Sequence, residues 1–138
     1  MRKKHNDSKN AQSILESAEK QMKYTLTLIS TEESAFNIVR NIYECFRMIG
    51  DALLISKGKI SEYHTEQIRI LADMKVRTER PIKLVDNLRR MRHNINYYGY
   101  SPRKIEAEDA INLAKSCFYQ LLSKAKEEIK NKNGPGGS

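Results

Sequence analysis

The sequence predicts an all-α protein, an up-and-down bundle of four to five antiparallel helices. Helix breakers are scarce, because the 138 residues include only three prolines and six glycines, and three of these glycines fall in residues 133–138. Apolar residues recur at spacings of three and four, which is the period of an amphipathic helix. The chain length suits one compact domain. We therefore expect a single helical domain over residues 1–133 and a flexible tail over residues 134–138.

Two amphipathic helices are expected in the first part of the chain, one over residues 8–29 and a second that ends near residue 56. The segment Ser30-Thr31-Glu32-Glu33 matches a capping box, in which the first and last side chains each accept the other residue's backbone amide. The second helix has the broadest apolar face and should occupy the centre of the bundle. Gly50 lies inside it, and a mid-helix glycine, which costs about 1 kcal/mol, indicates close approach by another helix.

The third helix is expected over residues 61–76, with Ser61 as its candidate N-cap. It is less hydrophobic than the two before it, so its buried stripe should be narrow. Short connections between successive helices favour antiparallel neighbours. The side chains that should point inward from this helix are Tyr63, Ile68, Leu71 and Met74.

The fourth helix should begin at Pro81, because proline is tolerated in a first turn, and should end at Tyr98 or Gly99. An alanine-rich fifth helix follows and carries apolar side chains from Ala107 to Ile129. With about 100° between successive residues, one apolar stripe runs along the fourth helix. Its members, all expected to face the core, are Leu84, Leu88, Met91, Ile95 and Tyr98.

Several classes of protein are disfavoured. Cys45 and Cys117 fall at apolar helical positions without the spacing of metal ligands, so we expect buried free thiols and neither a metal site nor a cofactor. No segment approaches the ~18 uninterrupted apolar residues of a membrane span. The basic start of the chain is not followed by the apolar stretch of an export signal. We expect a cytoplasmic protein with no membrane partner.

The charge of the chain is concentrated in one segment. Of the formal net charge of +8, residues 75–104 carry +7, with nine basic and two acidic side chains. Six of the nine are arginines. A soluble surface does not require arginine in particular, whereas the planar guanidinium group suits bidentate contacts with phosphate. The simpler interpretation of these charges is that they form a solvent-exposed helix face with no ligand. The basic residues are Lys75, Arg77, Arg80, Lys83, Arg89, Arg90, Arg92, Arg103 and Lys104.

A polar strip, residues 89–94, runs beside the apolar stripe of the fourth helix. Arg92 projects close to the buried seam, where a guanidinium is costly unless it meets an acceptor. That acceptor could be a carboxylate of another helix, a partner subunit or a phosphate. Tyrosines that follow the strip could stack on bases or could serve as core or interface groups. The candidate nucleic-acid-binding residues are Arg89, Arg90, Arg92, Asn96, Tyr98 and Tyr100.

The segment Leu88-Arg89-Arg90-Met91-Arg92-His93-Asn94-Ile95-Asn96-Tyr97-Tyr98-Gly99-Tyr100 resembles the HEPN superfamily of small helical domains, here as a small stand-alone protein. A helix ends in an arginine-polar motif, an aromatic-glycine turn follows, and residues 106–122 are similar to the alanine-rich last helix of that family. The resemblance implies a homodimer that acts on RNA or a nucleotide. It also implies a role in a toxin–antitoxin or defence system, or a minimal nucleotidyltransferase antitoxin as partner.

Many HEPN domains are metal-independent endoribonucleases whose motif is an arginine, four to six residues and a histidine. In that chemistry the arginine stabilises the phosphate and the histidine moves protons for attack by the 2′-hydroxyl. Counting from Arg92, tyrosines 97 and 98 stand where the histidine would. The candidate catalytic residues are therefore Arg92, His93 and Tyr97. We expect an RNA-binding or nucleotide-binding protein with a degenerate ribonuclease motif; the alternatives are an active ribonuclease and a structural partner of a nucleotidyltransferase.

Overall fold

The fold is that of a computed structural model, which describes residues 2–3, 7–60 and 63–132. Within these residues a 3-10 turn, η1 (Ile82–Leu84), precedes the fourth helix, and β1 (Arg2–Lys3) pairs antiparallel with β2 (Lys59–Ile60). The predicted all-α bundle is confirmed, while the predicted tail and the candidate cap Ser61 lie outside the described residues. The five α-helices described are α1 (Ser8–Thr25), α2 (Ala35–Ser56), α3 (His64–Ala72), α4 (Val85–Tyr98) and α5 (Lys104–Lys132).

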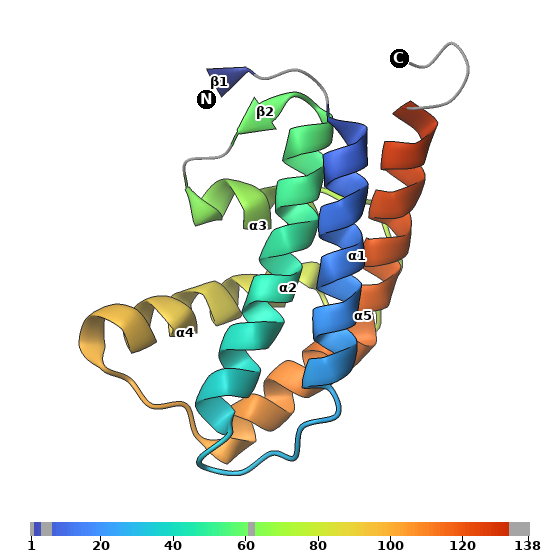
Figure 1. The fold of residues 1–138 in the computed structure, drawn as a ribbon. Helices are drawn as coiled ribbons and strands as arrows, with labels where there is room; N and C mark the ends of the chain where they lie inside the picture. The colour runs from blue at the N-terminus through green and yellow to red at the C-terminus, as the bar shows by residue number, and fades with distance from the viewer. Residues whose placement is uncertain (1, 4–6, 61–62, 133–138) are drawn as a thin grey trace.

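The three long helices α1, α2 and α5 run alongside one another, and the shorter α3 and α4 lie across them beside α2 (Figure 1). Helix α2 contacts each of the other four helices. The sequence explains this position, because its apolar residues cover a broad face and 13 of its residues are buried. The prediction that this helix forms the centre of the bundle is confirmed.

The core lies mainly between α1, α2 and α5, and α3 and α4 each add buried residues to it. Phe46 of α2 meets Phe118 of α5 edge to face, with ring centroids 5.4 Å apart. Each large apolar side chain that is fully buried contributes roughly 1.5–3 kcal/mol to folding. The largest fully buried side chains are Tyr43, Phe46, Phe118, Leu15, Met22, Ile38, Ile42, Ile49, Leu53, Leu71, Leu121 and Ile129.

Gly50 marks the closest approach of α3 to α2. A Cβ atom at this position would lie 2.1 Å from the carbonyl oxygen of Gln67, so no larger residue fits without displacing the α3 backbone. The side-chain amide of Gln67 also donates a hydrogen bond to the Asp51 carboxylate, at 3.1 Å. The close approach predicted from this glycine is confirmed.

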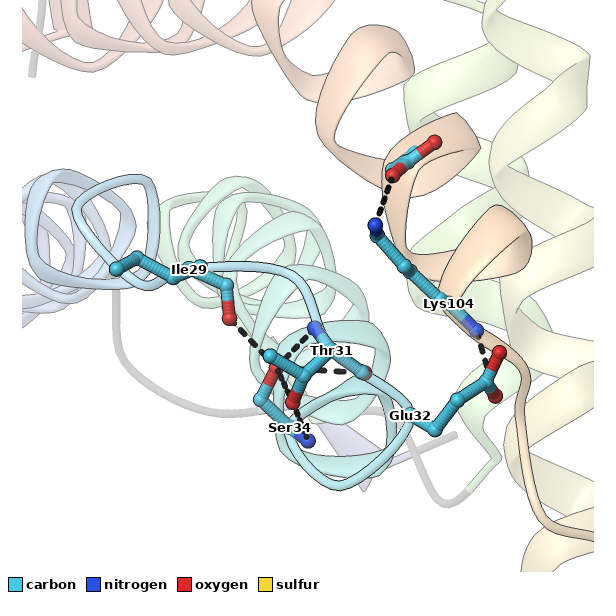
Figure 2. Close-up of polar contacts among 6 residues, drawn as sticks. Ile29, Thr31, Glu32, Ser34 and Lys104 are labelled. Carbon is cyan, nitrogen blue, oxygen red and sulfur yellow. Dashed lines mark hydrogen bonds and ion pairs between the residues drawn. The ribbon is translucent and has the colours of Figure 1, made fainter.

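The capping bonds before α2 lie one residue later than predicted. The reciprocal capping bonds form between Thr31 and Ser34, at 2.8 and 2.9 Å, and not between Ser30 and Glu33 (Figure 2). The Ser34 hydroxyl also donates to the carbonyl of Ile29, at 2.7 Å. The later register is favoured because this one hydroxyl satisfies a backbone donor and a backbone acceptor.

Helix α1 ends earlier than predicted, at Thr25. The amide of Thr27 donates to the carbonyl of Tyr24 in a tighter turn, and the Thr27 hydroxyl bonds to the same carbonyl. Threonine side chains compete in this way with the helical hydrogen-bond pattern. Ile29, expected on the buried face, is consequently 80% exposed, and that part of the prediction was wrong.

Helix α3 is shorter than predicted, because it begins at His64 and ends at Ala72. Ile68 and Leu71 are buried and Met74 is partly buried, as expected. Tyr63 is 64% exposed, so its predicted inward orientation was wrong. The reason is its position: it precedes the first helical turn, in extended backbone, and does not share the helical face.

Helix α4 ends at Tyr98 and is capped by Gly99, whose φ of 65° is the left-handed conformation that glycine adopts without strain. Leu88 and Ile95 are buried and Leu84 and Met91 are partly buried, so most of the predicted stripe is confirmed. Tyr98 is 76% exposed, and its predicted burial was wrong. The C-terminal end of α4 projects away from α2, so the bundle does not cover this last turn (Figure 1).

Cys45 on α2 and Cys117 on α5 are buried free thiols, as predicted. Burial raises the pKa of Cys45 to about 12 and that of Cys117 to about 11. Over the described part of the chain, no helix combines the length and apolarity that crossing a membrane requires.

Candidate anion-binding cavity

A cavity of about 400 Å³ lies where α4 faces α2 and the start of α3. Five of its lining residues belong to α4, and the others come from α2 and from the beginning of α3. We call it the α4 cavity. Its lining residues are Tyr43, Tyr63, Thr65, Arg89, Arg92, His93, Asn96 and Tyr97.

The helical period of α4 explains why its five lining residues come together. Positions 89, 92, 93, 96 and 97 correspond to i, i+3, i+4, i+7 and i+8, which share one face of a helix. The buried residues Leu88 and Ile95 fall on the adjacent face and fix the rotation of the helix against α2. The polar strip predicted beside the buried seam therefore forms one wall of a cavity.

Arg92 is the central basic group of the α4 cavity. Its guanidinium carbon lies 5.6 Å from the centroid of the Tyr43 ring, within the range of a cation–π contact. Its Nε atom is buried without a hydrogen-bond partner, and among the described residues Arg92 forms no ion pair. A buried donor without a partner costs roughly 1–3 kcal/mol, and more when it is charged. The acceptor that the sequence led us to expect is not a carboxylate of the described chain.

Arg89 differs from Arg92 because it has a partner on its own helix. Its Nε donates to the carboxylate of Asp86 at 2.7 Å, and Arg90 contacts the other oxygen of that carboxylate at 3.2 Å. The hydrogen bond from Arg89 lowers the pKa of Asp86 and raises that of Arg89. This pair holds Arg89 in the lining of the cavity, with its side chain 27% exposed.

Tyr43, from α2, is fully buried and contacts the guanidinium of Arg92. Burial raises the pKa of Tyr43 to about 12, although the nearby charges of Arg92 and Arg47 act in the opposite direction. Its side chain therefore stays a neutral phenol over the physiological range. The sequence placed Tyr43 only on the apolar face of its helix; a tyrosine on the most apolar helix is a weak signal that its hydroxyl meets a polar site.

His93 and Tyr97 form an aromatic pair on the α4 wall. Their ring centroids are 4.6 Å apart, with the ring planes inclined by 35°. The exposed fraction of Tyr97 is 73%, so much of its ring remains accessible. The structure thus brings the three candidate catalytic residues, Arg92, His93 and Tyr97, to one cavity.

The candidate nucleic-acid-binding residues are divided by the structure. Arg89, Arg92 and Asn96 line the α4 cavity, whereas Arg90, Tyr98 and Tyr100 do not. The Tyr100 hydroxyl donates to the carboxylate of Glu106 on α5, and that hydrogen bond raises the pKa of Tyr100. Tyr63 and Thr65 line the cavity although sequence reasoning assigned them no role there; no pattern within one helix shows which residues of another element will face it.

The described residues contain no group of three or more histidine, cysteine, aspartate or glutamate side chains placed to hold a metal ion. What the arrangement offers is a set of cationic, aromatic and neutral polar groups around one cavity, and the charged side chains that the described residues contribute to its lining are those of Arg89 and Arg92. Comparison with protein-family models, curated proteins and solved structures found no match. The resemblance to the HEPN superfamily stays a prediction.

Proposed function

We propose that this protein binds RNA and holds a phosphate group between Arg89 and Arg92 in the α4 cavity. Arginine donors match the oxygens of a phosphate in geometry and charge. Among the described residues no carboxylate lines the cavity, and the Asp86 carboxylate that pairs with Arg89 lies outside the lining, so an entering anion meets arginine side chains and neutral polar groups. The concentration of basic residues in the segment 75–104 adds a long-range attraction for a polyanion.

The observation that carries this proposal is the buried Nε of Arg92. A guanidinium that served only as surface charge would extend into water, and one that served only as a structural tie would have a carboxylate partner. Arg92 does neither in the described structure, since it is half-buried over Tyr43 with its Nε unbonded. An anion that enters the α4 cavity would contact the guanidinium of Arg92 and offset its partly buried charge.

A salt titration of RNA binding tests the proposal. The affinity of the protein for a single-stranded RNA should fall steeply with salt, with a logarithmic slope of about −0.7 for each phosphate neutralised. Arg92→Ala should weaken binding and make the slope shallower by about one phosphate, and Arg89→Ala/Arg92→Ala by about two. Arg103→Ala removes the same charge from a position outside the cavity and serves as the matched control.

Two outcomes would contradict the phosphate contact. One is an Arg92→Ala variant whose affinity and salt slope equal those of the wild type. The other is an equal loss in Arg103→Ala, which would show that net charge alone attracts RNA. Arg90→Ala separates the two faces of α4, because Arg90 is exposed and lies outside the cavity lining, and its effect should be the smaller one.

RNA cleavage is a second candidate function, favoured by the presence of His93 in the same cavity as Arg92. In this reaction a 2′-hydroxyl loses its proton to a base and attacks the neighbouring phosphorus; the 5′-oxygen leaves and takes up a proton. Products would carry a 2′,3′-cyclic phosphate and a 5′-hydroxyl. Incubation of RNA with the protein in EDTA should release these products from the wild type and not from His93→Ala. Equal cleavage by both proteins would exclude His93.

The resemblance to the HEPN superfamily extends the proposal to the cellular context. It favours a homodimer and a role in a toxin–antitoxin or defence system, with a minimal nucleotidyltransferase as a candidate partner. Sedimentation of the purified protein measures its mass and would show a monomer if the dimer does not form. Co-purification with such a transferase, with and without Arg89→Ala/Arg92→Ala, would show whether the α4 cavity or an apolar surface holds the partner.

A further inference from the structure

We infer that the α4 cavity accepts one unpaired nucleotide, with its base on the ring of Tyr97 and its phosphate on Arg92. This inference rests on the proposed function, which fixes only the phosphate contact. It adds the class of ligand, because a cavity that takes a whole nucleotide selects single strands over duplexes.

The lining of the α4 cavity matches the three chemical parts of a nucleotide. Arg89 and Arg92 offer donors for a phosphate. Asn96 and Thr65, from opposite walls, offer an amide and a hydroxyl that can both donate to and accept from a sugar hydroxyl or a base edge. Aromatic rings complete the lining, and rings of this kind stack on bases of any sequence. A site that bound only inorganic phosphate would need the two arginines but not the amide, hydroxyl and aromatic side chains.

Tyr97 is the best-placed ring for base stacking. It is one of the most exposed aromatic residues of the described chain, and it lines the cavity, whereas the similarly exposed Tyr98 does not. Packing against His93 limits the positions that its ring can take, which lowers the entropy lost when a base stacks on it. Tyr63, on the α3 side, is a second exposed ring in the same cavity.

The dimensions of the cavity favour a single unpaired nucleotide. A volume of about 400 Å³ falls at the lower end of sites that hold small organic ligands. Three elements, α2, α3 and α4, wall it. A base within a duplex is stacked on both faces and must be flipped out before it can enter such a site, whereas a base in a single strand enters without that penalty.

The test compares two tyrosines and two forms of one RNA. Fluorescence anisotropy would measure the binding of a labelled ten-nucleotide single strand, and of the same strand annealed to its complement. The single strand should bind about tenfold more tightly than the duplex, and Tyr97→Leu should weaken single-strand binding by about tenfold. Tyr97→Phe, which keeps the ring, should bind as the wild type does. Tyr24→Leu, an exposed tyrosine on α1, is the control.

Failure of this inference is distinguishable from failure of the proposed function. If Tyr97→Leu binds the single strand as tightly as the wild type while Arg92→Ala binds it weakly, the nucleotide pocket is overturned and the phosphate site stands. Equal binding of strand and duplex, or a larger loss in Tyr98→Leu than in Tyr97→Leu, also overturns it. If Arg92→Ala has no effect either, both proposals fail.

Competition by adenosine monophosphate tests whether the pocket accepts a free nucleotide as well as a nucleotide within an RNA strand. Competition by this compound that Tyr97→Leu weakens supports the pocket and shows that a free nucleotide enters it. Competition by inorganic phosphate at equal concentration would instead reduce the site to a phosphate contact and overturn the inference. Circular dichroism of each variant checks folding, and the exposure of Tyr97 means that its substitution should leave the helices intact.

Discussion

At the scale of single residues, Arg92 combines a cost to stability with a chemical advantage. Its buried Nε has no partner, and its contact with the Tyr43 ring offsets only part of the desolvation of the charge. Arg92→Met, which keeps an unbranched chain of similar apolar character without the guanidinium charge, should therefore raise the free energy of unfolding by about 1 kcal/mol. The same substitution should abolish the phosphate contact. Urea unfolding and RNA titration of one preparation would measure both effects.

The opposite sign would identify Arg92 as a structural residue. If Arg92→Met lowers the free energy of unfolding and leaves RNA binding intact, the guanidinium stabilises the contact of α4 with α2 and has no ligand. Arg92→Lys gives a further control, because it retains the charge but not the planar donors of a guanidinium. With a phosphate as ligand, this variant should keep the salt slope and lose part of the affinity.

At the scale of the elements, the start of α2 is capped by the hydroxyls of Thr31 and Ser34, one residue later than the capping box in the sequence predicts. Ser34→Ala removes the hydroxyl that accepts from the Thr31 amide and donates to the Ile29 carbonyl. The free energy of unfolding should fall by about 1 kcal/mol, as for the loss of other helix caps. Glu33→Ala is the matched control, since Glu33 would be the capping residue in the earlier register; thermal melts that show a greater loss for Glu33→Ala would contradict the structure.

The same turn also forms a hydrogen bond with the start of α5. The carboxylate of Glu32 accepts a hydrogen bond from the backbone amide of Lys104, the first residue of α5, at 3.1 Å (Figure 2). It thereby satisfies one of the free amides at a helix start. The capping-box pattern favours the earlier register, because its last residue is normally glutamate or glutamine, and a contact between residues 72 positions apart is invisible to it. The helices could thus be predicted, but not the residue at which α2 begins.

Prediction of the candidate site has a similar limit. The five lining residues on α4 could be grouped from the sequence, because one helical period places them on one face. Tyr43, Tyr63 and Thr65 could not be added, since they belong to α2 and to the beginning of α3, and only packing decides which faces meet α4. The burial expected for Tyr98 failed for a related reason: periodicity identifies an apolar face but not how far along a helix its neighbour extends.

At the scale of the whole molecule, the fold divides a charge that the sequence presents as one segment. Arg89 and Arg92 line the α4 cavity, whereas Arg77 lines a separate surface groove along α5 with Lys115 and Lys124. Two lysines of α5 thus lie beside Arg77 of the loop that follows α3, together with the acidic Glu127. The net charge of +8 therefore attracts polyanions from more than one side, while among the described residues Arg92 of the α4 cavity is the arginine whose buried donor has no hydrogen-bond partner.

The reactivity of the two cysteine thiols can show whether the helices of the bundle separate all together or one at a time. Cys45 on α2 and Cys117 on α5 belong to the same core, and burial raises the pKa of both thiols well above the ordinary value of 9.0. A group whose pKa is higher in the folded state stabilises the protein fully below about pH 9 and loses this contribution as pH rises toward 11 and 12. At pH 8 both thiols should therefore stay protonated and covered, and should react with a thiol reagent only through opening.

Cys45→Ala and Cys117→Ala each leave one thiol and allow the two helices to be followed separately. The largest buried side chains of α2 and α5 pack against each other, as Phe46 does against Phe118. Each remaining thiol should therefore react at the rate set by global unfolding, and both rates should rise in parallel with added urea. Comparison of each variant with its own unfolding kinetics allows for the small loss of stability that the substitution causes. A thiol on α5 that reacts faster than the protein unfolds would show instead that α5 detaches from α1 and α2 as a separate unit.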